Sequence, residues 1–460
     1  MMVFFKNPIV WVVIFFLLSS IFRLSNLDLI EFKSDEATTV YQTVQFLDHP
    51  YLIQRGLISG TGVYNSPLFN YLIIPLSLWS RDPQVLSGVI ALINSLSVAA
   101  FFLLVKRYYG QLTAIFASLL LVFSPWGVIF SRKIWAQDLI SLFLIPFFWL
   151  LHELILRKNT KVVLPLFALL VLLIQLHGSG LFLFTVTILI LLILRIRVSF
   201  KSVILGILIG LIPILPYVFF QISSYPLCPD CEAFLKYQQS FRAFDFNNFL
   251  RPFQIISGLG FYFVLGKTYA DFIAIFPLIN LLKYIFASGF LTTLMGILFV
   301  VTKKQKYLFL VIYFITLPFL FFITKTPAYM HYFVIIIPMS MLLFAIFISS
   351  AYSAVRSRFL KASIIAYFLL FLVSNITFTF FFYSFLGSKK FIEGDYGPIY
   401  SLTKDFIEKE TSNYRNLPYY DQLKRYAYIY AQSKDFHTKL GEFFQVKGEK
   451  GLAQREFEHE

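Results

Sequence analysis

An adjacent pair of carboxylates, Asp35-Glu36, is the first feature of this sequence with the residue types for acid–base chemistry. It follows the first apolar segment closely, and neighbouring side chains point about 100° apart on a helix. One carboxylate can therefore face a site while the other orients it. A carboxylate near a membrane surface is a tunable general base, because desolvation raises its pKa and a nearby cation lowers it. The structural alternative is that Ser34 and Asp35 cap a helix running through Val44.

A second group of ionisable residues, Arg132, Lys133 and Asp138, surrounds the start of a later apolar segment. Ionisable groups at membrane depth are costly and indicate function by default. The structural alternative is an ion pair between Arg132 and Asp138, with the Lys133 side chain reaching out to the membrane surface.

Two histidines, His177 and His331, stand at the ends of two further apolar segments. A lone histidine in a membrane protein is usually a packing residue, but two at one level beside Lys325, Tyr329 and Tyr332 favour a binding site. Their spacing is not that of a helical metal motif, and the predicted outward loops contain no Asp-x-Asp motif. The sequence therefore indicates no metal and no other cofactor, although a divalent metal remains compatible with it.

The two cysteines occur close together, as Cys228-Pro229-Asp230-Cys231. Two cysteines cannot complete a structural zinc site, and a thioredoxin-like role needs a βαβ context that is absent. A local disulfide in an oxidising compartment is the simplest interpretation. A pair of free thiols is the alternative.

The composition explains where these residues must be held. The chain has 460 residues, of which 58% are hydrophobic and only 14% charged, with 57 Phe and 27 Tyr. That excess of apolar surface needs lipid as its solvent. The formal net charge of +15 does not indicate nucleic acid, because the basic residues form small clusters between apolar segments. Part of the excess can hold anionic lipid or a phosphate.

Apolar segments long enough to cross a bilayer recur along the chain. The first is interpreted as a retained span and not as a signal peptide, because no small-x-small cleavage site follows it. We predict an all-α polytopic membrane protein with about eleven transmembrane helices, at residues 8–24, 84–105, 111–128, 134–155, 162–177, 179–194, 202–222, 283–301, 307–323, 332–350 and 362–386.

The distribution of Lys and Arg between the short loops predicts the orientation. Basic residues gather in one alternate set of loops, which the positive-inside rule places in the cytoplasm. The N-terminus is then cytoplasmic and the C-terminus extracytoplasmic, in a membrane that we expect to be a prokaryotic plasma membrane. The basic clusters are Lys106/Arg107, Arg157/Lys158/Lys161, Arg195/Arg197/Lys201, Lys303/Lys304/Lys306 and Arg356/Arg358/Lys361.

Three polar pieces then face outward. Within a membrane domain at 1–386, a first outward loop spans 25–83 and a second spans 223–282. A C-terminal tail occupies 387–460, with a helix expected from Tyr419 to Phe436. The first loop is long enough to need a function of its own. Its apolar stretch from Leu68 to Leu78, which contains Pro75, is predicted to be an interfacial helix and not a crossing.

Several of these features together resemble one family. The acidic pair Asp35-Glu36, Asn65-Ser66-Pro67-Leu68, Lys106-Arg107-Tyr108-Tyr109-Gly110, Ser124-Pro125, Ser131-Arg132 with Asp138, and His331-Tyr332 with Pro338 follow one another in the same order as in that family. Over about residues 8–350 the sequence is similar to the integral-membrane glycosyltransferases of the C-type fold. Within that fold it resembles the protein O-mannosyltransferase and aminoarabinose-transferase (ArnT-like) group. No β-trefoil insert of the mannosyltransferase kind is visible.

The resemblance implies a polyprenyl-phosphate-linked sugar as donor. It also implies transfer, with inversion, to a hydroxyl of a lipid, glycan or protein on the outer face of the membrane. Asp35 would be the general base, Glu36 would orient it or contact the sugar, and Arg132, Lys325 or His331 would hold the lipid phosphate. A lipid-linked glycan flippase without catalysis is the alternative, and a glycan polymerase or ligase with the same kind of donor is a third hypothesis.

Overall fold

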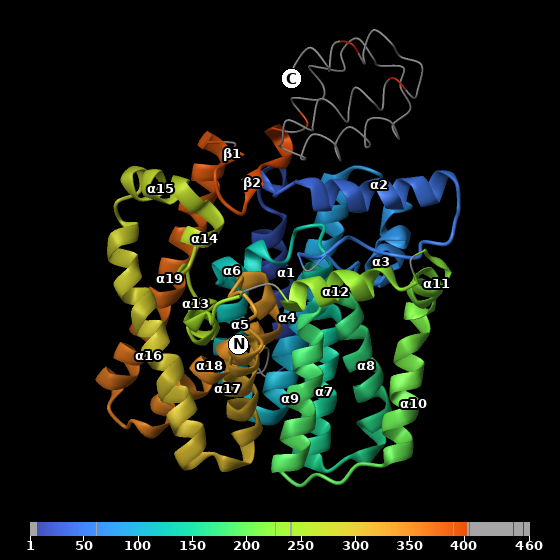
Figure 1. Ribbon diagram of the computed structural model, residues 1–460. Coiled ribbons are helices and arrows are strands. Elements are labelled where there is room, and N and C mark those ends of the chain that lie inside the picture. Colours follow the sequence, from blue (N-terminus) through green and yellow to red (C-terminus); the bar gives the residue numbers. More distant parts are fainter. Residues whose placement is uncertain are drawn as a thin grey trace.

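The computed structural model describes residues 7–402 except 61, 226, 240, 241 and 390, together with the single positions 404, 445 and 454. These residues form a bundle of long helices capped at one end by short helices that lie across it (Figure 1). The helix expected from Tyr419 to Phe436 lies outside the described residues.

Each of the eleven segments predicted to cross the membrane is helical. Several begin with a 3₁₀ turn or contain a break at proline. In chain order they are α1 (Pro8–Leu24), α4 (Pro83–Tyr109), α5 (Gln111–Phe123) with α6 (Pro125–Ile129), η3 (Ala136–Leu139) with α7 (Ile140–Arg157), η4 (Thr160–Val162) with α8 (Val163–Leu176), α9 (Ser179–Ile193), α10 (Phe200–Leu211) with η5 (Ile212–Ile214) and α11 (Leu215–Ser223), α16 (Ile279–Lys303), η8 (Gln305–Tyr307) with α17 (Leu308–Ile323), η9 (Met330–Ile336) with α18 (Ile337–Ala354), and α19 (Arg358–Lys389).

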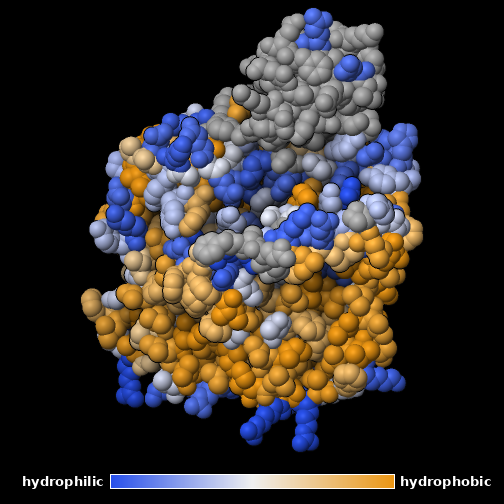
Figure 2. Space-filling view, viewed as in Figure 1, coloured by the Kyte–Doolittle hydropathy of each residue, from blue (hydrophilic) through white to orange (hydrophobic). Residues whose placement is uncertain are grey.

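Seven of these segments are long and apolar enough to cross a membrane by themselves. The others are shorter. The 13 residues of α5 extend about 20 Å, less than the roughly 30 Å of hydrocarbon. The chain bends at Ser124-Pro125 and continues as α6, whose first turn is capped by Ser124 Oγ accepting from Gly127 N at 3.1 Å. Figure 2 shows a broad apolar band with hydrophilic residues at both ends. The protein is therefore an integral, multi-pass membrane protein.

Burial separates the centre of the bundle from its edge. In the most apolar 18 residues of Met330–Ala354, 89% of the residues are buried. In those of Phe200–Ser223 only 11% are buried, so this segment presents apolar side chains to lipid. Glycines allow the closest approaches between helices. A Cβ at Gly296 in α16 would lie 2.2 Å from the Leu343 carbonyl of α18.

The end of the bundle that carries the predicted outward loops is covered by short elements. The 10-residue helix α3 extends about 15 Å, so the stretch predicted to be interfacial is too short to cross. Helix α2 lies across the bundle end in Figure 1. The elements here are η2 (Leu27–Leu29), α2 (Ser34–Asp48), α3 (Leu68–Ser77), α12 (Pro229–Gln239), η6 (Phe246–Phe249), α13 (Arg251–Gln254), α14 (Tyr262–Leu265), η7 (Gly266–Thr268) and α15 (Tyr269–Ile275).

The chain after the last crossing returns to the first outward loop. Helix α19 runs to Lys389, three residues beyond the predicted domain boundary at 386, and a two-stranded antiparallel sheet follows, formed by β1 (Phe391–Ile392) and β2 (Gly397–Pro398). An isolated bridge joins Glu31 to Ile399, and Tyr400 N donates to the Ile30 carbonyl at 2.8 Å. The start of the predicted tail is therefore packed against the loop that carries the acidic pair.

Candidate functional site

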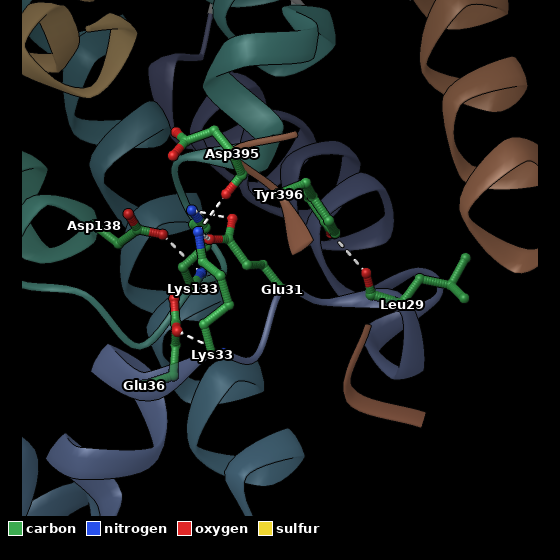
Figure 3. A network of polar contacts seen from close by, with 8 residues as sticks. All are labelled: Leu29, Glu31, Lys33, Glu36, Lys133, Asp138, Asp395 and Tyr396. Carbon is green, nitrogen blue, oxygen red and sulfur yellow. Dashed lines mark hydrogen bonds and ion pairs between the residues drawn. The ribbon is translucent and has the colours of Figure 1, made fainter. Parts of the chain in front are cut away.

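The centre of the candidate site is a buried carboxylate, Glu31, between two ammonium groups. Lys33 Nζ lies 2.5 Å from Glu31 Oε1, and Lys133 Nζ pairs with Glu31 Oε2. Glu31 is 2% exposed and Lys133 4% exposed. The attraction between the carboxylate and the two ammonium groups offsets part of the cost of burying these charges, and the group of three carries a net positive charge. Figure 3 shows the three side chains facing one another.

The predicted acidic pair lies in the first turn of α2, beside this cluster. The predicted helix is present, but its N-cap is Lys33 and not Ser34 or Asp35. The Glu36 carboxylate turns back and accepts from Lys33 N at 2.8 Å, as one half of a capping box. Glu36 is therefore fully buried. Asp35 is half-buried, and within the described part of the chain no hydrogen bond or ion pair occupies its carboxylate.

The surroundings shift the protonation of both acids. Burial, with the nearby charge of Glu31, raises the pKa of Glu36 to about 8, so this side chain is mostly protonated at neutral pH. Burial also raises the pKa of Asp35, although Lys33 and Lys133 oppose the rise. For Lys33, burial alone would lower the pKa, but the carboxylates of Glu31 and Glu36 outweigh it and raise the pKa above its ordinary value. Glu36 is enclosed, whereas Asp35 is only half-buried and is therefore the more accessible of the two carboxyls.

The residues of the second predicted group, Arg132, Lys133 and Asp138, have different partners in the structure. Asp138 accepts from Lys133 N at 2.6 Å, which fixes the turn that places Lys133 over the Trp135 ring, 4.0 Å from its centroid. The structural alternative for this group is wrong. In the described residues Arg132 and Asp138 form no ion pair, and Lys133 points inward because a carboxylate is there to receive it.

Arg132 joins the first outward loop to α19. Its guanidinium donates to the carbonyls of Ser25, at 2.6 Å, and Asn26, and to the Tyr383 hydroxyl of α19 at 2.7 Å. It is 3% exposed. These contacts make Arg132 a positioning residue, and its predicted contact with a lipid phosphate does not enter our proposal.

The two predicted histidines meet in an aromatic cluster. The ring centroids of His177 and His331 are 6.0 Å apart, and His331 lies 5.4 Å from Trp135, 5.6 Å from Tyr329 and 4.5 Å from Tyr332. Burial lowers the pKa of His177 to about 4, so its imidazole is neutral. Through Trp135 this cluster adjoins Lys133.

Lys325 lies apart from this cluster. Its Nζ is 5.1 Å from the ring centroid of Phe244, an exposed aromatic residue of the second outward loop, and its backbone is left-handed, with φ 54°. It does not line the cavity of the site.

A small cavity of about 80 Å³ lies between the Lys33–Glu31–Lys133 cluster and the aromatic cluster around His331. Glu31 and Lys133 line one side, Tyr329 and His331 another, and the segment after α19 a third. The space is sufficient for a few water molecules or one small polar group, and Tyr329, which is 49% exposed, lies at its edge.

Sequence reasoning missed the contribution of that last segment, Asp395-Tyr396. The Asp395 carbonyl accepts from Lys33 Nζ, and the Tyr396 hydroxyl donates to the Leu29 carbonyl at 2.6 Å (Figure 3). It also missed Glu31. The available signal was the pair Glu31 and Lys33 flanking Phe32 in an apolar stretch, where charged residues need partners. No local pattern indicates a contact across more than 360 residues.

The cysteines lie away from this cluster. Cys228 and Cys231 are joined by a disulfide at the start of α12. Between them, buried Asp230 accepts from Tyr64 N at 3.0 Å and from the Tyr217 hydroxyl at 2.5 Å. The disulfide loop thus fixes the middle of the first outward loop to α11.

No group of three or more His, Cys, Asp or Glu side chains with metal-site geometry occurs among the residues that the structure describes. The cations adjoining the carboxylates are instead the two lysine ammonium groups. The metal requirement of the site stays a prediction.

A helical bundle with an acidic pair on a helix across one end is the arrangement expected from the resemblance to the C-type integral-membrane glycosyltransferases. The fold matches two solved structures of that kind, which confirms the predicted resemblance at the level of fold. One is the ArnT of Cupriavidus metallidurans bound to undecaprenyl phosphate, with TM-score 0.53 and 14% identity over 94% of this chain and 91% of that one.

The other is the oligosaccharyltransferase of Archaeoglobus fulgidus in complex with zinc and sulfate, with TM-score 0.57 and 14% identity over 90% of this chain. This chain spans 56% of the length of that transferase. No protein-family profile matches the sequence, and no curated protein sequence matches it significantly.

Proposed function

We propose that the protein is a glycosyltransferase that moves a sugar from a polyprenyl-phosphate-linked donor to a hydroxyl of a lipid, glycan or protein acceptor. The observation that carries the proposal is Asp35. It is a half-buried carboxylate without a described partner, next to the Lys33–Glu31–Lys133 cluster, in a chain with this fold. Undecaprenyl phosphate bound to the ArnT of similar fold supports a polyprenyl phosphate carrier.

In this proposal Asp35 accepts the proton of the acceptor hydroxyl. The hydroxyl oxygen forms a bond to the anomeric carbon of the sugar, the bond from that carbon to the phosphate oxygen breaks, and polyprenyl phosphate leaves with the electron pair. A direct displacement of this kind inverts the configuration. The raised pKa of Asp35 makes it a stronger base than an ordinary aspartate.

The leaving phosphate needs fixed positive charge, since preorganised charges stabilise charge that develops in the transition state. Lys33 and Lys133 supply it, because two ammonium groups share the single carboxylate of Glu31. Tyr329 and His331 line the same cavity and can donate hydrogen bonds to phosphate oxygens. Glu36 is enclosed and holds the first turn of α2, so it positions Asp35 and does not touch the sugar.

The test is transfer by the purified protein from a panel of undecaprenyl- and dolichyl-phosphate sugars, followed by mass spectrometry of lipids and proteins. Asp35→Asn should lower the transfer rate at least 100-fold, within the range that a positioned general base contributes. Asp28→Asn is the matched control, because Asp28 is an exposed aspartate of the same loop. Full transfer by Asp35→Asn would remove Asp35 from the role of base.

The same preparation separates this proposal from the flippase alternative. In liposomes a flippase moves the labelled donor between leaflets without changing its linkage, whereas the transferase leaves free polyprenyl phosphate behind. The orientation of the site toward the outer face is part of the proposal, and labelling of an engineered cysteine at position 28 from outside intact cells tests it.

A further inference from the structure

A second pocket lies at the membrane face opposite the candidate site. Helices α4, α7 and α9 end there and η8 begins there, at the bottom of Figure 1. Its volume is about 510 Å³, and four of its lining residues are cationic, namely Arg107, Arg157, Lys158 and Lys306. Figure 2 shows hydrophilic side chains projecting below the apolar band on this face.

One buried carboxylate accounts for only part of this charge. Glu153 Oε1 accepts from Arg107 Nη2 at 2.8 Å and from the Tyr108 hydroxyl at 2.7 Å, and Arg157 Nε is 3.8 Å away. Lys158 and Lys306 make no ion pair with any residue that the structure describes. The pocket therefore holds cations that its own carboxylate does not neutralise.

Helix dipoles reduce this excess without removing it. The C-terminal ends of α4, α7 and α9 each present about half a negative elementary charge, and the N-terminal end of the η8–α17 segment presents about half a positive one. With Glu153 included, the negative contributions amount to about two and a half charges against about four and a half positive ones. An excess of about two charges is left, enough to hold one phosphate group.

Two of these cations, Arg157 and Lys306, lie near aromatic rings. Arg157 lies 5.9 Å from the centroid of the Tyr108 ring, and Lys306 lies 4.7 Å from that of Tyr307. The Tyr307 hydroxyl donates to the Tyr108 carbonyl at 2.7 Å, which joins the end of α4 to η8. Positions fixed in this way cost less ordering when an anion binds.

The lining also includes apolar residues at the edge of the lipid-facing band. Leu194 and Ile196 line the pocket, and Leu192 and Ile193, at the end of α9, are 67% and 57% exposed. A free anion gains nothing from contact with these apolar side chains, whereas a phospholipid carries acyl chains next to its phosphate. Basic pockets between transmembrane helices bind anionic head groups in this manner.

We propose that this pocket binds the phosphate head group of an anionic phospholipid from the adjacent leaflet. The proposal does not depend on the glycosyltransferase function. It goes beyond the general preference of loops on one membrane face for Lys and Arg, because it assigns binding to residues of the pocket and not to other basic residues of the same face.

The test compares two triple variants of the full chain in neutral detergent. The pocket variant is Arg157→Gln/Lys158→Gln/Lys306→Gln, and the control is Lys201→Gln/Arg358→Gln/Lys361→Gln, which removes the same charge outside the pocket. Binding of phosphatidylglycerol, phosphatidylcholine and inorganic phosphate is measured by native mass spectrometry and by the shift in melting temperature. Each basic residue near an anionic lipid surface contributes about 1 kcal/mol, so the pocket variant should bind phosphatidylglycerol roughly 100-fold more weakly.

The control should bind phosphatidylglycerol within about threefold of the unmodified protein, and phosphatidylcholine should bind weakly to all three. Equal losses in both triple variants would overturn the proposal, as would undiminished binding by the pocket variant. Inorganic phosphate giving the whole melting shift would make the pocket a site for a free anion and would also overturn it. If the pocket triple variant does not purify as a folded protein, Lys306→Gln against Lys361→Gln decides, with roughly a fivefold loss expected only for the first.

Discussion

The buried carboxyl of Glu36 makes the stability of the folded protein depend on pH in a direction opposite to that of most acids. Its pKa is about 8 in the folded chain against an ordinary value of 4.5. The unfolded chain therefore loses this proton as the pH rises above 4.5, while the folded chain keeps it until about pH 8. The stabilisation is complete below pH 4.5 and is lost as the pH rises to 8.

The size of this loss of stability follows from the difference between the two pKa values. Each pH unit between 4.5 and 8 removes about 1.4 kcal/mol, and the whole interval removes about 5 kcal/mol. Glu36→Gln keeps an oxygen that can accept from Lys33 N but has no proton to lose. The variant should match the unmodified protein near pH 5 and exceed it in melting temperature by about 5 °C near pH 9.

The assay is thermal unfolding of the purified protein in one detergent at pH 5, 6, 7, 8 and 9. Glu232→Gln is the control, since Glu232 is an exposed residue of α12 that pairs only with Lys236 within the described residues. The melting temperature of Glu232→Gln should stay close to that of the unmodified protein at every pH. A Glu36→Gln difference that does not grow with pH, or a variant less stable at pH 9, would refute the reasoning.

Three further outcomes follow from the site. Lys133→Met should lower the free energy of unfolding by about 3 kcal/mol, because it removes one partner of a buried ion pair. In thermal unfolding, the double variant Glu31→Gln/Lys133→Met should lose less stability than the sum of the losses in the two single variants. Additive losses would count against the pairing. Tyr396→Phe should cost about 1 kcal/mol, as expected for one buried hydrogen bond, measured by the same unfolding assay; an unchanged melting temperature would contradict the Tyr396–Leu29 contact. Dialysis against EDTA should leave the proposed transfer unchanged, because the ammonium groups of Lys33 and Lys133 already pair with Glu31; activity lost and then restored by a divalent cation would show that the site needs a metal.

The crossings could be predicted because lipid imposes a length on apolar segments. The prediction was wrong in detail where an apolar segment is not one continuous helix. The segment expected at 111–128 is divided at Ser124-Pro125 into α5 and α6, where a serine cap and a proline start a new helix. The short helices of the second outward loop were not predicted individually, because one or two turns leave no periodic pattern.

The site was only partly predictable, for a different reason. Topology placed Asp35 and Lys133 at the same membrane face, and the structure brings them into one neighbourhood. The sequence did not show that Glu31 would be the partner of Lys133, since nearby Asp138 was the more obvious choice. Asp138 instead accepts a backbone N–H, and the carboxylate that receives the ammonium group comes from the loop after α1.

The contacts of Ile399 with Glu31 and of Asp395 with Lys33 also order events during biosynthesis. Ribosomes deliver the first loop long before residues 391–402, and until α19 has been inserted the Lys33 ammonium group lacks its carbonyl partner. Newly inserted chains therefore hold Asp35 in an unfinished setting through most of translation. A nonsense mutation between residues 390 and 395 would leave the transmembrane helices in the membrane with a candidate site that is still open on one side.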